Sequence, residues 1–150
     1  MTIEGKTAAK VFTFLNDEIL AGHGDLVLPG TESLSGVLKR YPEGGENQMH
    51  CHHDQDHTFY VLQGQATFHL EKDENVTVAG EGEAVLLPRM TYYRFLSSGE
   101  KKLVMIRVSN SESNHGRLDT EGRPIPSPSD FRAAGGADQR QQAPVRELPF

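Results

Sequence analysis

The chain has 150 residues, of which 36% are hydrophobic and 24% charged, and its formal net charge is −6 at pH 7. This length suits one domain, and the lack of a long apolar run argues against a membrane-spanning segment. The acidic balance, without a cluster of Lys or Arg, argues against a nucleic-acid partner, because phosphate binding needs a basic surface.

The first residues and the cysteine content indicate the cellular compartment. Residues 1–14 lack the basic stretch followed by an apolar core that marks a secretory signal. The single cysteine, Cys51, cannot form an internal disulfide, which is typical of a reducing compartment. We therefore expect a cytoplasmic protein that binds a small molecule or another protein, with no membrane and no nucleic acid as partner.

Residues 1–25 form an N-terminal segment of mixed pattern. Its stretch AKVFTFLNDEIL, residues 9–20, suits either a short helix or a strand followed by a turn, and the pattern does not decide between them. From residue 26 to 108 the chain changes to short β-rich runs separated by Gly, Pro, Asn and Asp, which is typical of an antiparallel sandwich or barrel. The expected strands lie at residues 33–41, 58–64, 65–71, 75–80, 83–88, 91–96 and 102–109.

Some of these strands are apolar on both faces. Phe59 and Val61 alternate with Tyr60 and Leu62, whereas a strand with one solvated face would alternate apolar and polar residues. The outer face is therefore expected to be covered, either by the same chain or by a second subunit, and we predict a homodimer. If the protein is a monomer, the N-terminal segment or the tail is the expected cover.

The last part of the chain, residues 109–150, is polar and rich in Pro, Gly, Ser and Gln. This composition predicts an irregular C-terminal tail and not a second domain.

Four of the seven histidines lie in the stretch HCHHDQDH, residues 50–57. His50 and His52 are two residues apart, so a strand would point both imidazoles to one face and Cys51 to the other. The following HDQD resembles a hairpin connection, which would place His57 beside the pair as a third metal ligand. Such a site leaves positions open for water and substrate. A polar hairpin with surface histidines is the alternative.

The spacing around these histidines resembles the first motif of the cupin family. That motif runs glycine, five residues, His-x-His, three or four residues, glutamate, six residues, glycine. Gly44, His50, His52, His57 and Gly64 reproduce every interval, with His57 in place of the glutamate.

The second cupin motif is recognisable by its intervals more than by its residue types. It runs glycine, five residues, proline, x, glycine, two residues, histidine, three residues, asparagine. Gly82 and Pro88 are kept, whereas Met90 replaces the glycine, Tyr93 the histidine and Ser97 the asparagine. The resemblance covers roughly residues 36–108.

The resemblance implies an all-β fold, a cupin-type jelly-roll β-barrel followed by the irregular tail, with a metal inside the barrel. Three-His cupin sites that use ferrous iron are known, so Fe(II) is favoured at His50, His52 and His57, although imidazole also suits Zn, Ni and Mn. The implied function is a metal-dependent small-molecule enzyme, a three-His dioxygenase or a lyase or isomerase, acting on a small organic acid or an enolisable carbonyl compound. The alternatives are a non-catalytic cupin that binds a metal or small ligand, and one that has lost its metal.

Tyr93 is the expected catalytic residue. Alternation in the strand points it inward with Phe95, and a phenol with a pKa near ~10 is a poor metal ligand. We expect its hydroxyl to orient the substrate or to transfer a proton, the alternative being a packed core tyrosine. Arg40 and Arg107 could each bind a substrate carboxylate through two parallel hydrogen bonds, but strand-end arginines are more often surface residues, so neither is placed in the site.

Overall fold

The computed structural model describes residues 8–110, 116–126 and 141–148. These residues form one short helix, α1 (Asp17–Ala21), and thirteen strands. The strands are β1 (Lys10–Phe12), β2 (Gly24–Val27), β3 (Ser35–Tyr41), β4 (Gly45–His52), β5 (His57–Gln63), β6 (Gln65–Leu70), β7 (Val76–Gly80), β8 (Ala84–Leu87), β9 (Tyr93–Ser97), β10 (Leu103–Ser109), β11 (Arg117–Leu118), β12 (Gln141–Gln142) and β13 (Val145–Glu147).

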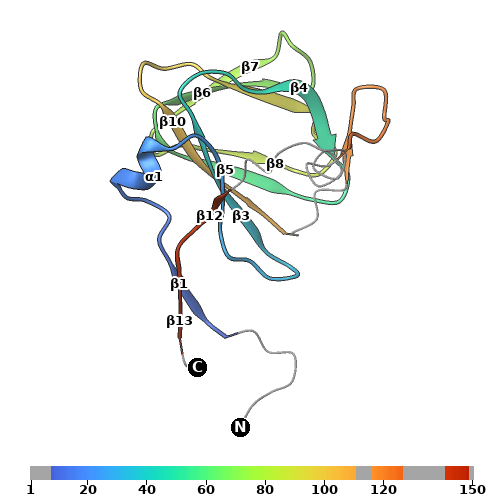
Figure 1. Ribbon diagram of the computed structural model, residues 1–150. Coiled ribbons are helices and arrows are strands. Elements are labelled where there is room, and N and C mark those ends of the chain that lie inside the picture. Colours follow the sequence, from blue (N-terminus) through green and yellow to red (C-terminus); the bar gives the residue numbers. More distant parts are fainter. Residues whose placement is uncertain (1–7, 111–115, 127–140, 149–150) are drawn as a thin grey trace.

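Two sheets face each other and enclose the core (Figure 1). One has the strand order β12-β2-β3-β10-β5-β8 and the other the order β11-β4-β9-β6-β7. The predicted all-β jelly-roll fold is confirmed, and each of the seven expected strands lies within two residues of its predicted bounds. The barrel is an open one, because the backbone hydrogen bonds of the described residues do not join the two sheets into a closed ring.

Glycine at the motif positions allows tight connections between these strands. Gly64 has a φ of +79°, a left-handed conformation that favours glycine, and it joins β5 to β6. A Cβ atom at position 64 would lie 2.8 Å from the carbonyl oxygen of Lys102, so a residue with a side chain would clash with the backbone at this connection.

The N-terminal segment contains both of the structures that its pattern allowed. Lys10–Phe12 is strand β1, and a turn later the helix α1 begins after Asn16, whose side-chain oxygen accepts a hydrogen bond from the Ile19 amide at 2.8 Å. Asp17 in the first turn adds a favourable interaction with the helix dipole. Within the described ranges no helix is long and apolar enough to cross a membrane.

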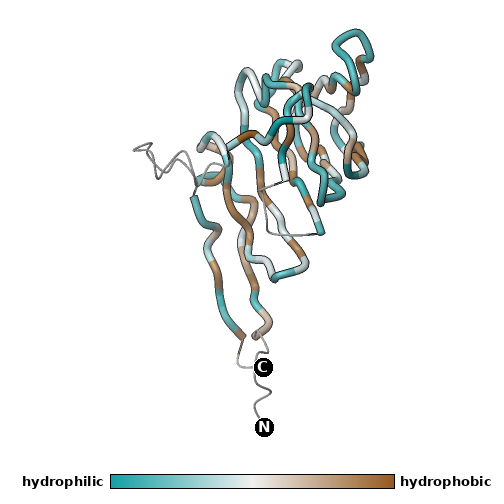
Figure 2. The backbone as a smooth tube through the Cα atoms, turned by 90° about the vertical axis from the view of Figure 1, so that its right-hand side faces the viewer, coloured by the Kyte–Doolittle hydropathy of each residue, from teal (hydrophilic) through white to brown (hydrophobic). Residues whose placement is uncertain are grey.

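The tail is less irregular than its composition predicted. Strand β11 pairs with β4, β12 pairs in parallel with β2, and β13 pairs with β1. The physical reason is that the edge strands β2 and β4 present unpaired backbone groups, which these short segments satisfy. The β1–β13 ribbon extends away from the two sheets in both views (Figures 1 and 2).

Both ends of the chain cover the outer face of β3 and β10. Leu38 and Val104 are completely buried there, in a cluster that includes Ile19 from α1 and Ala143 after β12. The apolar outer face of β10 is therefore covered by the same chain, as expected for a monomer.

Arg40 on β3 forms hydrogen bonds to both of the chain segments that cover this face. Its guanidinium donates hydrogen bonds to the carbonyl oxygens of Ile19, His23 and Gly24 at 2.9, 3.0 and 3.1 Å, and to Oε1 of Gln141 at 2.7 Å. A charged donor forms stronger hydrogen bonds than a neutral one, so this side chain holds the two ends of the chain together. Arg40 thus has a structural role outside the space between the sheets.

The homodimer remains a prediction, and its basis is now confined to β5 and β8. Tyr60, Leu62 and Leu86 lie on the outer face of these strands and are 47%, 37% and 66% exposed. We expect Leu86→Glu to give a monomer, because a charge on this apolar surface would have to be desolvated in the dimer. Val78→Glu, at a residue that is 52% exposed on β7 of the other sheet, is the control and should remain dimeric.

Light scattering at micromolar concentration checks this expectation. A wild-type protein with the monomer mass of 16.6 kDa would contradict it.

Candidate functional site

The three histidines predicted as ligands come together between the two sheets. His50 and His52 share one face of β4, and His57 is the first residue of β5. The ring centroids of His50 and His52 are 5.3 Å apart, those of His52 and His57 are 4.1 Å apart, and all three side chains are buried. Surface histidines on a polar hairpin are therefore excluded.

The connection between β4 and β5 is not the hairpin that we predicted. Strand β4 pairs with β9 and β11, whereas β5 pairs with β10 and β8, so residues 53–56 cross from one sheet to the other. The crossing is anchored at both ends. The His53 amide and its Nδ1 both donate to the carbonyl of Gly116, and Asp56 forms an exposed ion pair with Arg89 at 3.1 Å. These bonds, made far along the chain, favour the crossing over a local turn.

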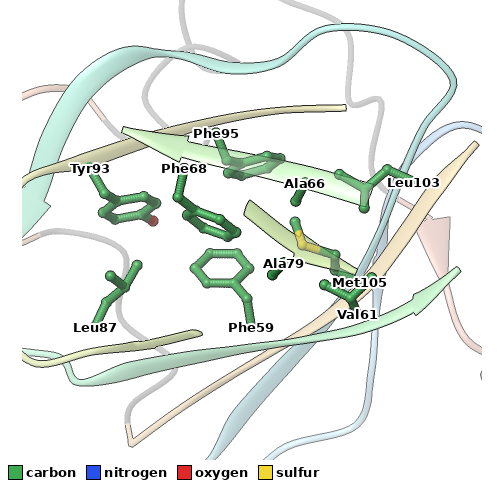
Figure 3. Packing of buried hydrophobic residues seen from close by; sticks show 10 residues of the cluster. All are labelled: Phe59, Val61, Ala66, Phe68, Ala79, Leu87, Tyr93, Phe95, Leu103 and Met105. Carbon is green, nitrogen blue, oxygen red and sulfur yellow. The ribbon is translucent and has the colours of Figure 1, made fainter. Parts of the chain in front are cut away.

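Tyr93 points inward, as its strand phase predicted. It is opposite His50 in the β4–β9 pairing, with ring centroids 4.5 Å apart, and its hydroxyl lies 3.4 Å from Nε2 of His52. Figure 3 shows Tyr93 at one end of the row of core side chains, beside Phe68 and Leu87. Burial, reinforced by the negative charge of Glu46, raises the pKa of Tyr93 well above its usual value, so the phenol keeps its proton at neutral pH.

Each of the three imidazoles has one buried nitrogen without a hydrogen-bond partner. Nδ1 of His50 donates to the carbonyl of Gln48 at 2.7 Å, and Nε2 of His57 donates to Oε1 of Gln55 at 2.9 Å. Nε2 of His50, Nδ1 of His52 and Nδ1 of His57 are left unpaired. Because unpaired buried polar atoms cost free energy, they indicate a site built for a ligand.

A carboxylate that the sequence analysis missed faces these histidines. Oε1 of Glu46 accepts a hydrogen bond from Nζ of the buried Lys39 at 3.0 Å, and its Oε2 lies 3.6 Å from Nε2 of His50. Burial alone would raise the pKa of Glu46, but Lys39 lowers it below its usual range, so the side chain is ionised. Since His50 is neutral and donates through Nδ1, two acceptor atoms face each other, and a proton or a cation belongs between them.

The donor atoms of this site suit a divalent metal, but the three histidines are not placed so that they could bind one ion together. Burial lowers the pKa of all three histidines, to about 2 for His52 and about 3 for His57, so they are the neutral imidazoles that metals need. Among the described residues, however, no three His, Cys, Asp or Glu side chains are placed so that they could hold an ion. A shared ion would require side chains to turn, and the ligand role of the histidines stays a prediction.

The two arginines singled out from the sequence lie on opposite faces of their sheet. Arg40 faces outward, whereas Arg107 on β10 lies on the same face as Met105 and points between the sheets. The charge of Arg107 adds to burial in lowering the pKa of His57. Arg107 therefore belongs to the site, in which the sequence analysis did not place it.

The turn before β9 ties the second motif to the first. The backbone amide of Met90 donates to the carbonyl of His52 at 2.7 Å, which fixes the end of β4. Met90 has a φ of 71°, the left-handed conformation for which the family motif has a glycine. The backbone geometry of the motif is thus kept although the residue has changed, and the exposed methionine side chain lies at the surface.

The comparisons with known proteins agree with this fold. The family model of the cupin domain matches residues 37–109. Similar solved structures include KdgF from Halomonas sp., at 22% identity and a TM-score of 0.54 over 60% of this chain and 79% of that chain. Pac13 from Streptomyces, described as a nucleoside dehydratase, has 18% identity and a TM-score of 0.52 over 65% and 72% of the two chains.

A protein with a double-stranded β-helix domain from Klebsiella pneumoniae has 21% identity and a TM-score of 0.55 over 63% of this chain and 83% of its own. No curated protein matches the sequence. At these identities the solved structures show the fold alone.

Because the buried histidines are neutral, we predict that acid begins to destabilise the protein at a higher pH than titration of its carboxylates would. Their pKa values rise from about 2 and 3 in the folded protein, for His52 and His57, to about 6.5 on unfolding. Their contribution to stability is therefore complete above pH 6.5 and is lost as the pH falls toward the folded values. Each should lower the free energy of unfolding by about 1.4 kcal/mol per pH unit below about pH 6.

Urea unfolding with a chelator present, between pH 7.5 and pH 5, measures this slope. His52→Gln should reduce the slope, whereas His23→Gln, at an exposed histidine, should leave it unchanged. An equal slope in the wild type and in His52→Gln would mean that His52 is not buried in its neutral form.

Proposed function

Because residues 37–109 form a cupin domain, we propose that the protein is a small-molecule enzyme whose active site lies at His50, His52, His57 and Tyr93. The observation that carries this proposal is the set of three buried, neutral imidazoles, each with an unpaired nitrogen, around a protonated tyrosine. A purely structural core would not retain so many unpaired polar atoms. The proposed substrate is a small organic acid or an enolisable carbonyl compound.

We assign a divalent metal to His50, His52 and His57. Bound there, the ion would supply a Lewis acid that polarises an oxygen atom of the substrate. Three neutral ligands leave its charge uncompensated, which favours an anionic or enolate-forming substrate. Fe(II) is the favoured ion from the resemblance to three-His cupins, with Zn, Ni and Mn as the other ions that imidazole suits. The facing acceptor atoms of Glu46 and His50 support a cation at this position.

The chain's own residues orient the substrate and hold its protons. The hydroxyl of Tyr93 keeps its proton and lies near Nε2 of His52, so it can donate to a substrate oxygen held beside the histidines. Phe59 packs against the ring of Tyr93, and Phe95 packs against Phe59. Both phenylalanines are fully buried and close the inner side of the site to water. The ring is thereby fixed, which is the condition for efficient proton transfer.

The reaction class is proposed as an oxygenation by a three-His dioxygenase, or as a lyase or isomerase reaction. The second class has a precedent in the fold, because the structural neighbour Pac13 is a nucleoside dehydratase. Fold similarity at this identity does not transfer a substrate. An oxygen-consumption screen against small acids and diketones separates the two classes.

The metal assignment predicts that alanine at His50, His52 or His57 abolishes stoichiometric metal. Each substitution removes one of only three proposed ligands, so the ion should be lost from protein purified anaerobically without an affinity tag. Elemental analysis measures the metal content, and His23→Ala is the matched control. Full occupancy in all three variants would refute the assignment. In the wild type, metal at 100 times its Kd should stabilise the fold by about 2.7 kcal/mol.

The proposed role of Tyr93 predicts that Tyr93→Phe keeps the metal and loses turnover by roughly 10²–10⁴-fold, the contribution of a positioned general acid or base. Tyr92→Phe is the control, since the hydroxyl of Tyr92 donates to the carbonyl of Asp119 at 2.9 Å, on the other face of the strand. If Tyr93 is instead a metal ligand, its phenylalanine variant should lose metal affinity and, with ferric iron, a visible charge-transfer band. Unchanged metal, ligand binding and turnover would show a tyrosine that only packs.

A further inference from the structure

Arg107 is a cation inside the site that has no part in the roles proposed for the histidines and Tyr93. On β10 it lies opposite Val37 of β3 and Phe59 of β5, both buried. Met105, two residues before it, is part of the core between the sheets. Alternation therefore directs the guanidinium into the same space, where only 6% of the residue remains exposed.

The guanidinium of Arg107 is not fully hydrogen-bonded. Its Nε is buried without a hydrogen-bond acceptor, and no carboxylate within the described ranges forms an ion pair with it. Arg40, equally buried on the neighbouring strand, donates instead to three carbonyls and to Gln141. Because a buried donor without an acceptor costs free energy, the open Nε–H of this cation indicates an acceptor that is supplied from outside the chain, for which an anion is best suited.

The carboxylates nearest to Arg107 form their ion pairs with another cation. Lys39, the other buried cation between the sheets, is paired with Asp25 at 3.2 Å and with Glu46 at 3.0 Å. The histidines are neutral. The positive charge of Arg107 lies near enough to His52 and His57 to lower the pKa of both further than burial does. The charge of Arg107 also helps to lower the pKa of Glu46, so the charges of Lys39 and Arg107 together are balanced by those of Asp25 and Glu46, while the guanidinium of Arg107 forms no ion pair of its own among the described residues.

We propose that Arg107 binds the carboxylate of a small organic acid and so orients the substrate toward the histidines and Tyr93. The Nε and one terminal nitrogen of a guanidinium match the two oxygens of a carboxylate in parallel hydrogen bonds. This assignment deepens the proposed function and rests on it for the site of the chemistry, but the binding itself needs no metal.

A monocarboxylate fits better than a phosphate group. Oε2 of Glu46 has no hydrogen-bond partner and would repel a second negative charge on the ligand. Arg117 of β11 is a further cation whose charge reaches Tyr93 and whose Nε also has no acceptor, but the residue is less buried than Arg107, and its Nη2 donates to the carbonyl of Pro126 at 3.4 Å. The buried fork of Arg107 is thus the position that a single carboxylate would occupy.

The first test follows Arg107 directly, in metal-free wild-type protein. The Nε–H resonance of Arg107, assigned by its loss in Arg107→Lys, is recorded in ¹H–¹⁵N spectra during titration with pyruvate, pyruvamide and inorganic phosphate. We expect pyruvate to shift this resonance and to bind at least tenfold more tightly than pyruvamide, its neutral counterpart, as charge-assisted hydrogen bonds require. Equal binding of pyruvate and pyruvamide, or no shift with pyruvate, would overturn the proposal. Tighter binding of phosphate than of pyruvate would overturn the carboxylate assignment.

The second test removes the charge. In Arg107→Gln, binding of pyruvate should weaken roughly 10- to 100-fold. The control is Arg94→Gln, which should bind like the wild type, because Arg94 follows Tyr93 on β9 and faces the opposite side of that strand. Arg107→Gln should also unfold at no lower urea concentration than the wild type, because Arg107 forms no ion pair with a carboxylate among the described residues, whereas loss of an arginine with a structural role would lower that concentration. Unchanged pyruvate binding in folded Arg107→Gln contradicts the proposal.

The outcomes separate this proposal from the proposed function. Arg107→Gln should keep the metal content of the wild type, because the guanidinium is not a ligand. Protein that binds pyruvate through Arg107 but never binds metal would keep the carboxylate assignment and remove the metal-dependent activity. Metal binding and turnover without discrimination between pyruvate and pyruvamide would do the reverse.

Discussion

The two-residue period of the β-strand is the constraint on which this molecule depends. His57, Phe59 and Val61 face inward from one strand, and Tyr93 and Phe95 do so from another. The same strands therefore fill the aromatic core and carry the polar site, with no change of face between them. A core residue and a residue of the proposed site are neighbours in each row, so packing of the phenylalanines fixes the direction of the imidazoles and of the phenol.

Polar groups between the sheets are matched in one part of the site and left unmatched in another. Lys39 is balanced by Asp25 and Glu46, and its pKa is raised by them although burial alone would lower it. This network fixes charge across the space between the sheets, because Lys39 and Glu46 come from opposite sheets. Unpaired atoms lie beside it, at the three histidines and at Nε of Arg107, and also at Oε2 of Glu46 itself. The side chains proposed to bind the ligand thus adjoin the ion pairs that stabilise the fold, and Glu46 belongs to both groups.

Local pattern predicted most of the fold, and it predicted the site where intervals and alternation decide the geometry. The positions of His50, His52 and Tyr93 follow from strand phase, and the strands from their turn residues. The connection before His57 could not be predicted in this way, because Gly116, 63 residues beyond His53, holds it in place. Glu46 was missed for a related reason: its partner lies on the other sheet, and β4 has an irregular register between Glu46 and His50. Strands that are apolar on both faces gave no phase for Arg40 or Arg107.

The bonds of Arg40 to both ends of the chain have a consequence for the order in which the protein is made. Most pairings of strands β2 to β10 can form once residue 109 has left the ribosome, whereas β11 on β4 and β12 on β2 are added later. Gln141 and Ala143, which complete the outer cover, are translated later. Until then Leu38 and Val104 lie without the residues that later cover them, and such exposed apolar side chains promote aggregation. The nascent chain thus has most of its paired strands before it has the residues that cover the outer face of β3 and β10.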